Sequence, residues 1–299
     1  MKTKQFFGRA LSVVALTMIG FLISCSENDA MFEQEAADVA EDAITDYYFE
    51  DADDMTSIAL LADDGPETGG RMAESRTIII QDPRFNCNGV VVTITIDEAS
   101  TFDTPLGDIV IDFGTGCSDV LGNIRKGKIL VHFEGRRFQP GSTVVTTFDG
   151  YSINDIALSG TRTLTNITGS NTESPKFSIQ LADGKAVWPD GAQATRDHCF
   201  VRTWLRELNP LNDAMEVDQC PDADYAAQGT NRRGREYKME ILEPLLYKRG
   251  CPIAVSGVKQ FTVTGGKVIT VDYGDGTCDR VITITIDGNT RTLNVSKNG

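Results

Sequence analysis

The sequence predicts an all-β protein of antiparallel sheets, either sandwich-like or extended, preceded by an acidic, partly helical tether. Three observations favour this class. β-Branched segments of strand length follow one another from residue 77 almost to the end of the chain, and two parts of that region resemble each other. Acidic residues are concentrated in the segment before it.

Residues 1–24 have the pattern of a secretory signal peptide. Lys2, Lys4 and Arg9 precede an apolar stretch from Ala10 to Ile23. A membrane-spanning helix needs roughly 20 apolar residues, so we expect a leader and not a span. The A-x-A pattern of an ordinary signal-peptidase site does not occur in this leader.

The end of the leader, Leu22-Ile23-Ser24-Cys25, resembles the lipobox of bacterial lipoproteins. The resemblance implies a diacylglycerol on Cys25, cleavage before Cys25 and acylation of the new N-terminus, for example with palmitate. Several acyl chains, at ~0.8 kcal/mol per buried CH₂, give a durable membrane anchor. Ser26 stands where many inner-membrane lipoproteins have aspartate, so the expected location is the outer membrane, facing the periplasm or the cell surface. The alternative is an ordinary signal peptide with an incidental cysteine.

Residues 25–75 form the expected tether. The chain as a whole carries a formal charge of −15, and residues 26–75 alone contain 16 acidic residues and one basic residue. The region from 76 to 299 is therefore close to neutral, at about −3. Neither part has the basic character of a nucleic-acid-binding protein.

Within the tether, apolar side chains recur at steps of three or four residues, at Phe32, Ala36, Val39, Ala43 and Tyr47. This spacing predicts an amphipathic helix with these residues on its apolar stripe. Its acidic residues are expected to be solvated, in a spacer that either lifts the body off an anionic membrane or merely keeps the linker soluble.

The region after the tether is expected to contain two related β units, 76–166 and 167–299. In each, a cysteine precedes a strand, a turn and a second strand, which ends in "DFGTGCSD" or "DYGDGTCD". "IDGNTRTL" predicts a hairpin that turns at Gly288-Asn289. "CFVRTWLRELNPLNDAMEV" fits either a strand entering a loop or a short helix.

Six cysteines remain when Cys25 is set aside, and an even number in an exported chain predicts three disulfides. They are Cys87, Cys117, Cys199, Cys220, Cys251 and Cys278. The sequence alone allows fifteen connectivities. The similarity of the two units suggests Cys87–Cys117 and Cys251–Cys278, which leaves Cys199–Cys220. A zinc site is the competing interpretation, although the sequence contains no C-x-x-C pair and only two histidines.

Several segments resemble a group of uncharacterised exported lipoproteins of Bacteroidota. The shared motifs are a C-P-x-x-V-S-G strand, present here as "CPIAVSG", and the turn "DYGDGTCD" before a C-terminal hairpin. "VIDFGTGCSDVLGNIRKGKILV" and "TTFDGYSINDIALSGTRTLTN" match the group as well. The resemblance implies an all-β, lipid-anchored protein, and it carries over no catalytic residues.

Calcium is the first candidate ligand, because Asp272, Asp275 and Asp279 lie close together in the "DYGDGTCD" turn. Carboxylate oxygens suit calcium, but Gly274 breaks the EF-hand pattern. Asp and Gly are also the usual residues of tight turns, and this interpretation is the favoured one.

Thiol catalysis would need His132 or His198 beside a free cysteine, and a disulfide at Cys199 would exclude it. Trp188 and Trp204 could form a sugar-stacking platform, or they could pack in the core. The basic segment "NRRGR", residues 231–235, could bind an anionic group or form a solvated turn.

The expected role is therefore non-enzymatic binding or interaction in the cell envelope, with no cofactor, no assigned metal site and an unidentified ligand or protein partner. Two alternatives stay open. One is a carbohydrate-active hydrolase whose carboxylates meet only in the folded chain. The other is a calcium-stabilised, adhesin-like module.

Overall fold

The computed structural model describes residues 11–62, 75–87, 89–120, 122–207, 212–251, 253–265 and 268–294, with the side chains of the N-terminal helix described from Phe32 onward. The leader residues 1–10 and the end of the tether, 63–74, lie outside the described residues, as do the side chains of Cys25 and Ser26.

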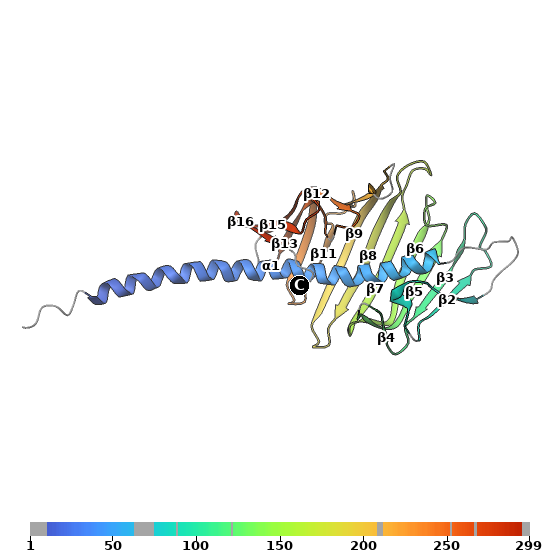
Figure 1. Ribbon diagram of the computed structural model, residues 1–299, viewed down its shortest axis with the longest axis horizontal. Helices are drawn as coiled ribbons and strands as arrows, with labels where there is room; N and C mark the ends of the chain where they lie inside the picture. Colours follow the sequence, from blue (N-terminus) through green and yellow to red (C-terminus); the bar gives the residue numbers. More distant parts are fainter. Residues whose placement is uncertain are drawn as a thin grey trace, which may run out of the picture.

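Within these residues the chain forms one long helix and one antiparallel sheet of sixteen strands (Figure 1). The helix α1 spans Leu11–Leu61, and a short 3-10 helix spans Pro83–Phe85. The strands are β1 (Ser75–Ile78), β2 (Val91–Ile96), β3 (Leu106–Asp112), β4 (Cys117–Ser118), β5 (Ile124–Glu134), β6 (Thr143–Ile153), β7 (Ile156–Asn166), β8 (Lys176–Val187), β9 (Gln193–Leu205), β10 (Ala214–Gln219), β11 (Ala227–Thr230), β12 (Glu236–Lys248), β13 (Ser256–Val263), β14 (Val268–Asp275), β15 (Val281–Ile286) and β16 (Asn289–Asn294).

Most strands pair with their neighbours in chain order, as in a long meander. The sheet runs β1-β2-β3-β5-β6-β7-β8-β9-β10-β12-β13-β14-β15-β16, with β4 beside β5 and β11 bridging β9 and β12. The all-β prediction is confirmed, and the arrangement is the extended one of the two that were expected. The sheet continues without a break from β7 to β8, where the two predicted units would meet. Their division stays a prediction.

The strands form where the sequence alternates. In β5, for example, Ile129, Val131 and Phe133 are buried at every second position, because successive side chains of a strand point to opposite faces. The ambiguous stretch after Cys199 forms the end of β9 and the strand β10. The C-terminal hairpin turns one residue earlier than predicted, at Asp287 and Gly288, whose φ angles of 49° and 77° are both positive.

The helix α1 lies across one face of the sheet, so the molecule has two layers (Figure 1). Its C-terminal part, with Phe49 and Met55 fully buried, joins a hydrophobic cluster with strands β2–β9. Further back along the helix, Phe32 joins a second cluster with strands β9–β15. The helix is therefore part of the core of both halves of the sheet.

The helical part of the tether is confirmed, and Phe32, Ala36 and Val39 of the predicted stripe pack against the sheet, but the stripe is wrong for its last two residues. Ala43 and Tyr47 face solvent, Tyr47 with 54% of its surface exposed. Asp38 and Asp42, expected to be solvated, are each 4% exposed. A segment buried in this way is not a free spacer, and its acidic side chains must find partners on the sheet.

The three predicted disulfides are confirmed. Cys87–Cys117, Cys199–Cys220 and Cys251–Cys278 are bonded, with Cα–Cα distances of 5.6, 5.4 and 5.5 Å. The first joins the segment before β2 to β4, the second joins β9 to the end of β10, and the third joins the turns that follow β12 and β14. Each closes a loop of 21 to 30 residues. Cys199 is therefore not a free thiol, and the Cys/His nucleophile suggested by its neighbour His198 is not present.

Candidate binding site

Five arginines of the sheet region face α1 and bind its carboxylates; we call them the arginine row. They come from β5, β7, β9 and the turn before β12. The pairs are Arg125 with Asp51 (2.6 Å), Arg162 with Glu50 and Asp53 (both 3.1 Å), Arg196 with Asp42 and Asp46, Arg202 with Glu50 (3.1 Å), and Arg235 with Asp38 (2.5 Å) and Glu35 (3.2 Å).

The helix supplies these carboxylates from one face. Glu35, Asp38, Asp42, Asp46 and Glu50 follow at steps of three or four residues, which places them above one another along a helix. The arginines of the strands stand at the same every-second positions as buried apolar residues, as Arg162 does with Leu158 and Leu164 in β7, and so point to the inner face of the sheet. Three of these arginines, Arg125, Arg162 and Arg196, are at most 2% exposed.

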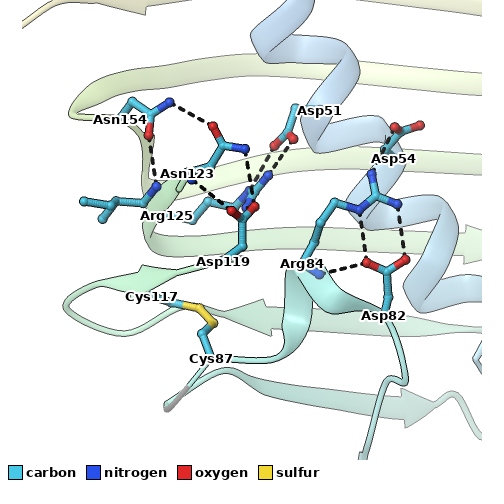
Figure 2. Close-up of polar contacts among 11 residues, drawn as sticks. Asp51, Asp54, Asp82, Arg84, Cys87, Cys117, Asp119, Asn123, Arg125 and Asn154 are labelled. Carbon is cyan, nitrogen blue, oxygen red and sulfur yellow. Dashed lines mark hydrogen bonds and ion pairs between the residues drawn. A yellow bond between two sulfur atoms is a disulfide. The ribbon is translucent and has the colours of Figure 1, made fainter. Parts of the chain in front are cut away.

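Figure 2 shows the Arg125 contact. The guanidinium lies between Asp51 of α1 and Asp119, whose carboxylate also accepts hydrogen bonds from the backbone and side chain of Asn123. In the same view Arg84, in the 3-10 helix, binds Asp82 and reaches Asp54 of α1 at 3.2 Å. The helix is thus fastened by charge pairs at several points along its length.

These ion pairs, together with burial, change the pKa values of the residues that form them. Burial alone would lower the pKa of Arg162, but Asp53 and Glu50 raise it above its usual value. Burial would raise the pKa of Glu50, but Arg162 and Arg202 hold it well below the usual range. For Asp46 the balance is opposite, because burial raises the pKa of the carboxyl group more than Arg196 lowers it.

The basic segment 231–235 binds an anionic group, and that group belongs to α1. Asn231 donates to Asp38 at 2.6 Å, Arg233 lies 3.1 Å from Glu41, and Arg235 binds Asp38 as described above. The segment is a turn, as expected, with Gly234 at a φ of 75° and residues 232–234 exposed. It is not fully solvated, because Asn231 and Arg235 complete the docking of the helix.

His198 is buried between Arg162 and Arg196. Its Nε2 lies 3.5 Å from a nitrogen of Arg162, and its Nδ1 accepts from Nε of Arg196 at 3.3 Å. Burial, followed by the charges of Arg196 and Arg162, holds the pKa of His198 well below 6.5. His132 is half exposed on β5 and pairs with Asp108 at 2.8 Å, as expected of an ordinary strand side chain.

The three aspartates considered as calcium ligands form hydrogen bonds within their own turns. Asp272 accepts from the backbone N–H of Gly274, Asp275 from the backbone and hydroxyl of Thr277, and Asp279 from the N–H of Val281. Within the described ranges, no three acidic, histidine or cysteine side chains gather in a way that could hold a metal ion. The geometry therefore agrees with the favoured interpretation of these residues as turn formers.

Two cavities lie beside α1, one after the other along the helix. The first, of about 570 Å³, lies by the end of the helix and the strands β2, β3 and β5. The second, of about 540 Å³, lies by Glu50 and Asp54 of the helix and by the strands β7 to β10 and β12. Apolar side chains dominate the first lining, among them Leu60, Phe102, Ile109, Phe133, Phe138 and Val144.

The two tryptophans have different roles. Trp188 is 8% exposed, and the guanidinium of Arg232 lies 5.0 Å above its ring. Trp204 is 40% exposed, lines the second cavity and packs against Phe138, with the ring centroids 5.9 Å apart. One tryptophan, and not two, is therefore positioned to contact a ligand.

Arg137, in the turn between β5 and β6, borders both cavities and a narrow gap under α1. Its Nε is buried and has no hydrogen-bond partner in the described part of the chain. Burial lowers the pKa of Arg137; the charge of Asp53 opposes this effect, and the charge of Arg202 adds to it. Sequence reasoning did not single out this residue, since nothing in "GRRFQ" distinguishes it from Arg136.

The carboxylates of the second cavity are already engaged. Glu50 is bound by two arginines and Asp54 by Arg84. Asp213 accepts a hydrogen bond from the backbone N–H of Glu207. Glycoside hydrolysis needs a carboxyl group that keeps its proton. Glu50, with its pKa held low by its arginines, is a poor proton donor near neutral pH, whereas burial raises the pKa of Asp54 above its usual value.

Together these features define an all-β protein with a docked helix and two adjacent cavities. Comparison with known proteins found no matching family model, no similar curated protein and no similar solved structure. Among the described residues, no helix combines the length and the apolar character needed to cross a membrane.

Proposed function

We propose that the chain is a lipid-anchored protein of the outer membrane, held through Cys25, that binds a small ligand beside α1 without chemically altering it. The observation that carries the binding role is the pair of cavities next to Arg137, of about 570 and 540 Å³. Both volumes fall within the range of roughly 300–1,000 Å³ that is typical of small-molecule sites.

The anchor is inferred from the lipobox-like end of the leader. The docking of α1 then determines how far the sheet lies from the bilayer. Phe32 is buried against the sheet seven residues after Cys25. In a helix, with a rise of about 1.5 Å per residue, that separation is only about 10 Å. The acidic segment would then hold the sheet close to the bilayer, and would not act as a long spacer.

Metabolic labelling with palmitate tests the anchor. We expect the wild-type chain and a Ser26→Ala control to be labelled and recovered with the outer membrane, and Cys25→Ala to carry no label. Labelling that persists in Cys25→Ala would refute the anchor.

Tryptophan fluorescence tests the binding role. Because Trp204 lines the second cavity and Trp188 is buried elsewhere, a bound ligand should change the emission of the wild-type protein and of Trp188→Phe, but not of Trp204→Phe. Amphiphiles, glycan fragments and short peptides from the envelope would be tested in turn. If none of them changes the emission of Trp204, the binding role is wrong, and release of products from a glycan would favour the hydrolase instead.

A further inference from the structure

Arg137 differs from every member of the arginine row. Those arginines each bind a carboxylate of α1, whereas the guanidinium of Arg137 has no ion pair or side-chain hydrogen bond among the described residues. The ring of the adjacent Phe138 has its centroid 5.9 Å from the guanidinium carbon. A half-buried cation without an anionic partner is costly, because it loses water without gaining a counter-charge.

The backbone holds Arg137 in this position. Its carbonyl oxygen accepts hydrogen bonds from the hydroxyl of Ser142 at 3.1 Å and from the side chain of Asn166 at 3.0 Å. Asn166 is buried at the end of β7, so the turn is fastened to the neighbouring strand. A fixed backbone reduces the entropy that a ligand must remove when it binds a side chain of this turn.

The nearby carboxylates of Asp53 and Asp54 raise the pKa of Arg137, but neither forms an ion pair with it. Asp53 is bound by Arg162 at 3.1 Å, and Asp54 is bound by Arg84 at 3.2 Å. The second cavity is lined by Arg137, Arg202, Lys248 and Arg249 and by three carboxylates, Glu50, Asp54 and Asp213. Arg202 is bound by Glu50, and Lys248 and Arg249 have no ion pair among the described residues. The junction of the two cavities therefore favours a negatively charged group, which a guanidinium can hold through two parallel hydrogen bonds.

The lining of the first cavity indicates the chemical character of the rest of the ligand. Leu60, Ile109, Phe133 and Val144 give it an apolar wall that begins beside Arg137. We propose that the site binds an anionic amphiphile, with its carboxylate or phosphate head group on Arg137 and its apolar chain in the first cavity. This inference deepens the proposed binding function and rests on it.

Binding of dodecanoate, dodecanol and dodecyltrimethylammonium below their micelle concentrations tests the inference. The protein would be the chain from Ser26 to Gly299, which keeps every described contact between α1 and the sheet. We expect dodecanoate to bind about tenfold or more tighter than dodecanol, because a charge-assisted hydrogen bond to a carboxylate accounts for at least that factor. The cationic amphiphile should bind weakest. Dodecyl phosphate identifies the preferred head group.

Substitutions test whether Arg137 causes the preference for the anionic amphiphile. Arg137→Gln should abolish the preference for dodecanoate and leave dodecanol binding unchanged, and Arg137→Lys should keep part of the preference. Arg232→Gln removes a charge next to Trp188 and is the control that should bind like the wild type. Since Arg137 has no described ion pair, Arg137→Gln should also unfold at nearly the wild-type urea concentration.

The outcomes separate the inference from the function on which it rests. Equal binding of dodecanoate and dodecanol, or a preference that survives in Arg137→Gln, would overturn the anionic head group while the cavity still binds. A response of Trp204 to glycans or peptides alone would overturn the amphiphile. If no compound of any class binds, the proposed function fails together with the inference.

Discussion

Buried charge is the dominant feature at the scale of single residues. Arg125, Arg162 and Arg196 are almost fully buried, yet each meets at least one carboxylate of α1. Such pairs add little net stability when intact, but a single member left alone costs several kcal/mol. His198 lies among these cations and is the residue whose protonation they oppose most directly.

We predict that His198 makes folding stability dependent on pH. Above pH 6.5 the ring is neutral in both states and contributes nothing. Below pH 6.5 the unfolded chain binds a proton that the folded protein excludes, so the free energy of unfolding falls by up to about 1.4 kcal/mol per pH unit until the lowered pKa of the folded state is reached.

Urea unfolding at pH 7.5 and pH 5.5 would measure this effect. His198→Gln should lose less stability on acidification than the wild type. His132→Gln alters the exposed histidine of β5 and should behave like the wild type. Equal losses in all three proteins would contradict the role of His198.

At the scale of elements, α1 is held to the sheet by charge as well as by apolar contact. Its inward face combines Phe49, Ala52 and Met55 with the carboxylates that meet the arginine row. An isolated helix of this composition would turn its carboxylates to water. The arginines of β5, β7 and β9 reverse that preference, because they offer partners that offset the loss of hydration.

Two adjacent residues of β5 test this docking. Arg125→Met should lower the free energy of unfolding by about 3–5 kcal/mol, since it leaves Asp51 and Asp119 buried without their cation. Lys126→Met breaks an exposed pair with Asp155 and should cost less than about 1 kcal/mol. Urea unfolding would compare the two variants.

A double variant, Arg125→Met with Asp51→Leu, should recover part of the loss, because one of the two orphaned carboxylates is then removed. Equal effects of the Arg125 and Lys126 single variants would show that the buried contact does not hold the helix.

At the scale of the whole molecule, one sheet and one helix share a single interface. Both hydrophobic clusters of the sheet include residues of α1, from Phe32 at one end to Ala59 at the other. A sheet of this kind keeps one face against the core and the other in water. Without α1, the inner face would expose its apolar side chains and leave the arginine row without partners.

We therefore predict that residues 75–299 alone do not fold cooperatively, whereas the chain from Ser26 does. Adding a peptide of residues 30–62 should restore a cooperative thermal transition and the near-ultraviolet circular dichroism of the aromatic core. If the fragment 75–299 unfolds at the same temperature as the longer chain, α1 is not needed for folding and the acidic segment is only a tether.

The strands and the disulfides could be predicted because their signals are local or repeated. Alternation places Ile129 and Val131 inside, and the matching order of cysteines and turns in the two units led to the correct pairing of Cys87 with Cys117. The inward positions Phe32, Ala36 and Val39 of α1 follow the predicted stripe, but the orientation of the next part of the helix could not be predicted in this way. Tyr47 was expected inside and Asp42 outside, and the reverse holds, because the deciding partners lie in other elements.

The candidate site was the least predictable part. Trp204 was noted as one of two possible ligand contacts, but its position on a cavity depends on Phe138, which is far from it in the chain. Arg137 differs from the other arginines because no described carboxylate binds it, and the sequence could not show this because it depends on the side chains that folding brings near. The one available signal was the contrast between a strongly acidic segment and arginines at inner positions of several strands.

By itself the sequence determined that the chain forms antiparallel strands, a helix in the acidic segment and three cross-links, because alternation, helical spacing and repeated cysteine order act over short distances. Only the tertiary structure decided which face of the later part of the helix is buried, which arginines meet its carboxylates and where the cavities lie. The contacts responsible join residues 74 to 200 positions apart, and the energy of a charge depends on the groups that folding brings to it.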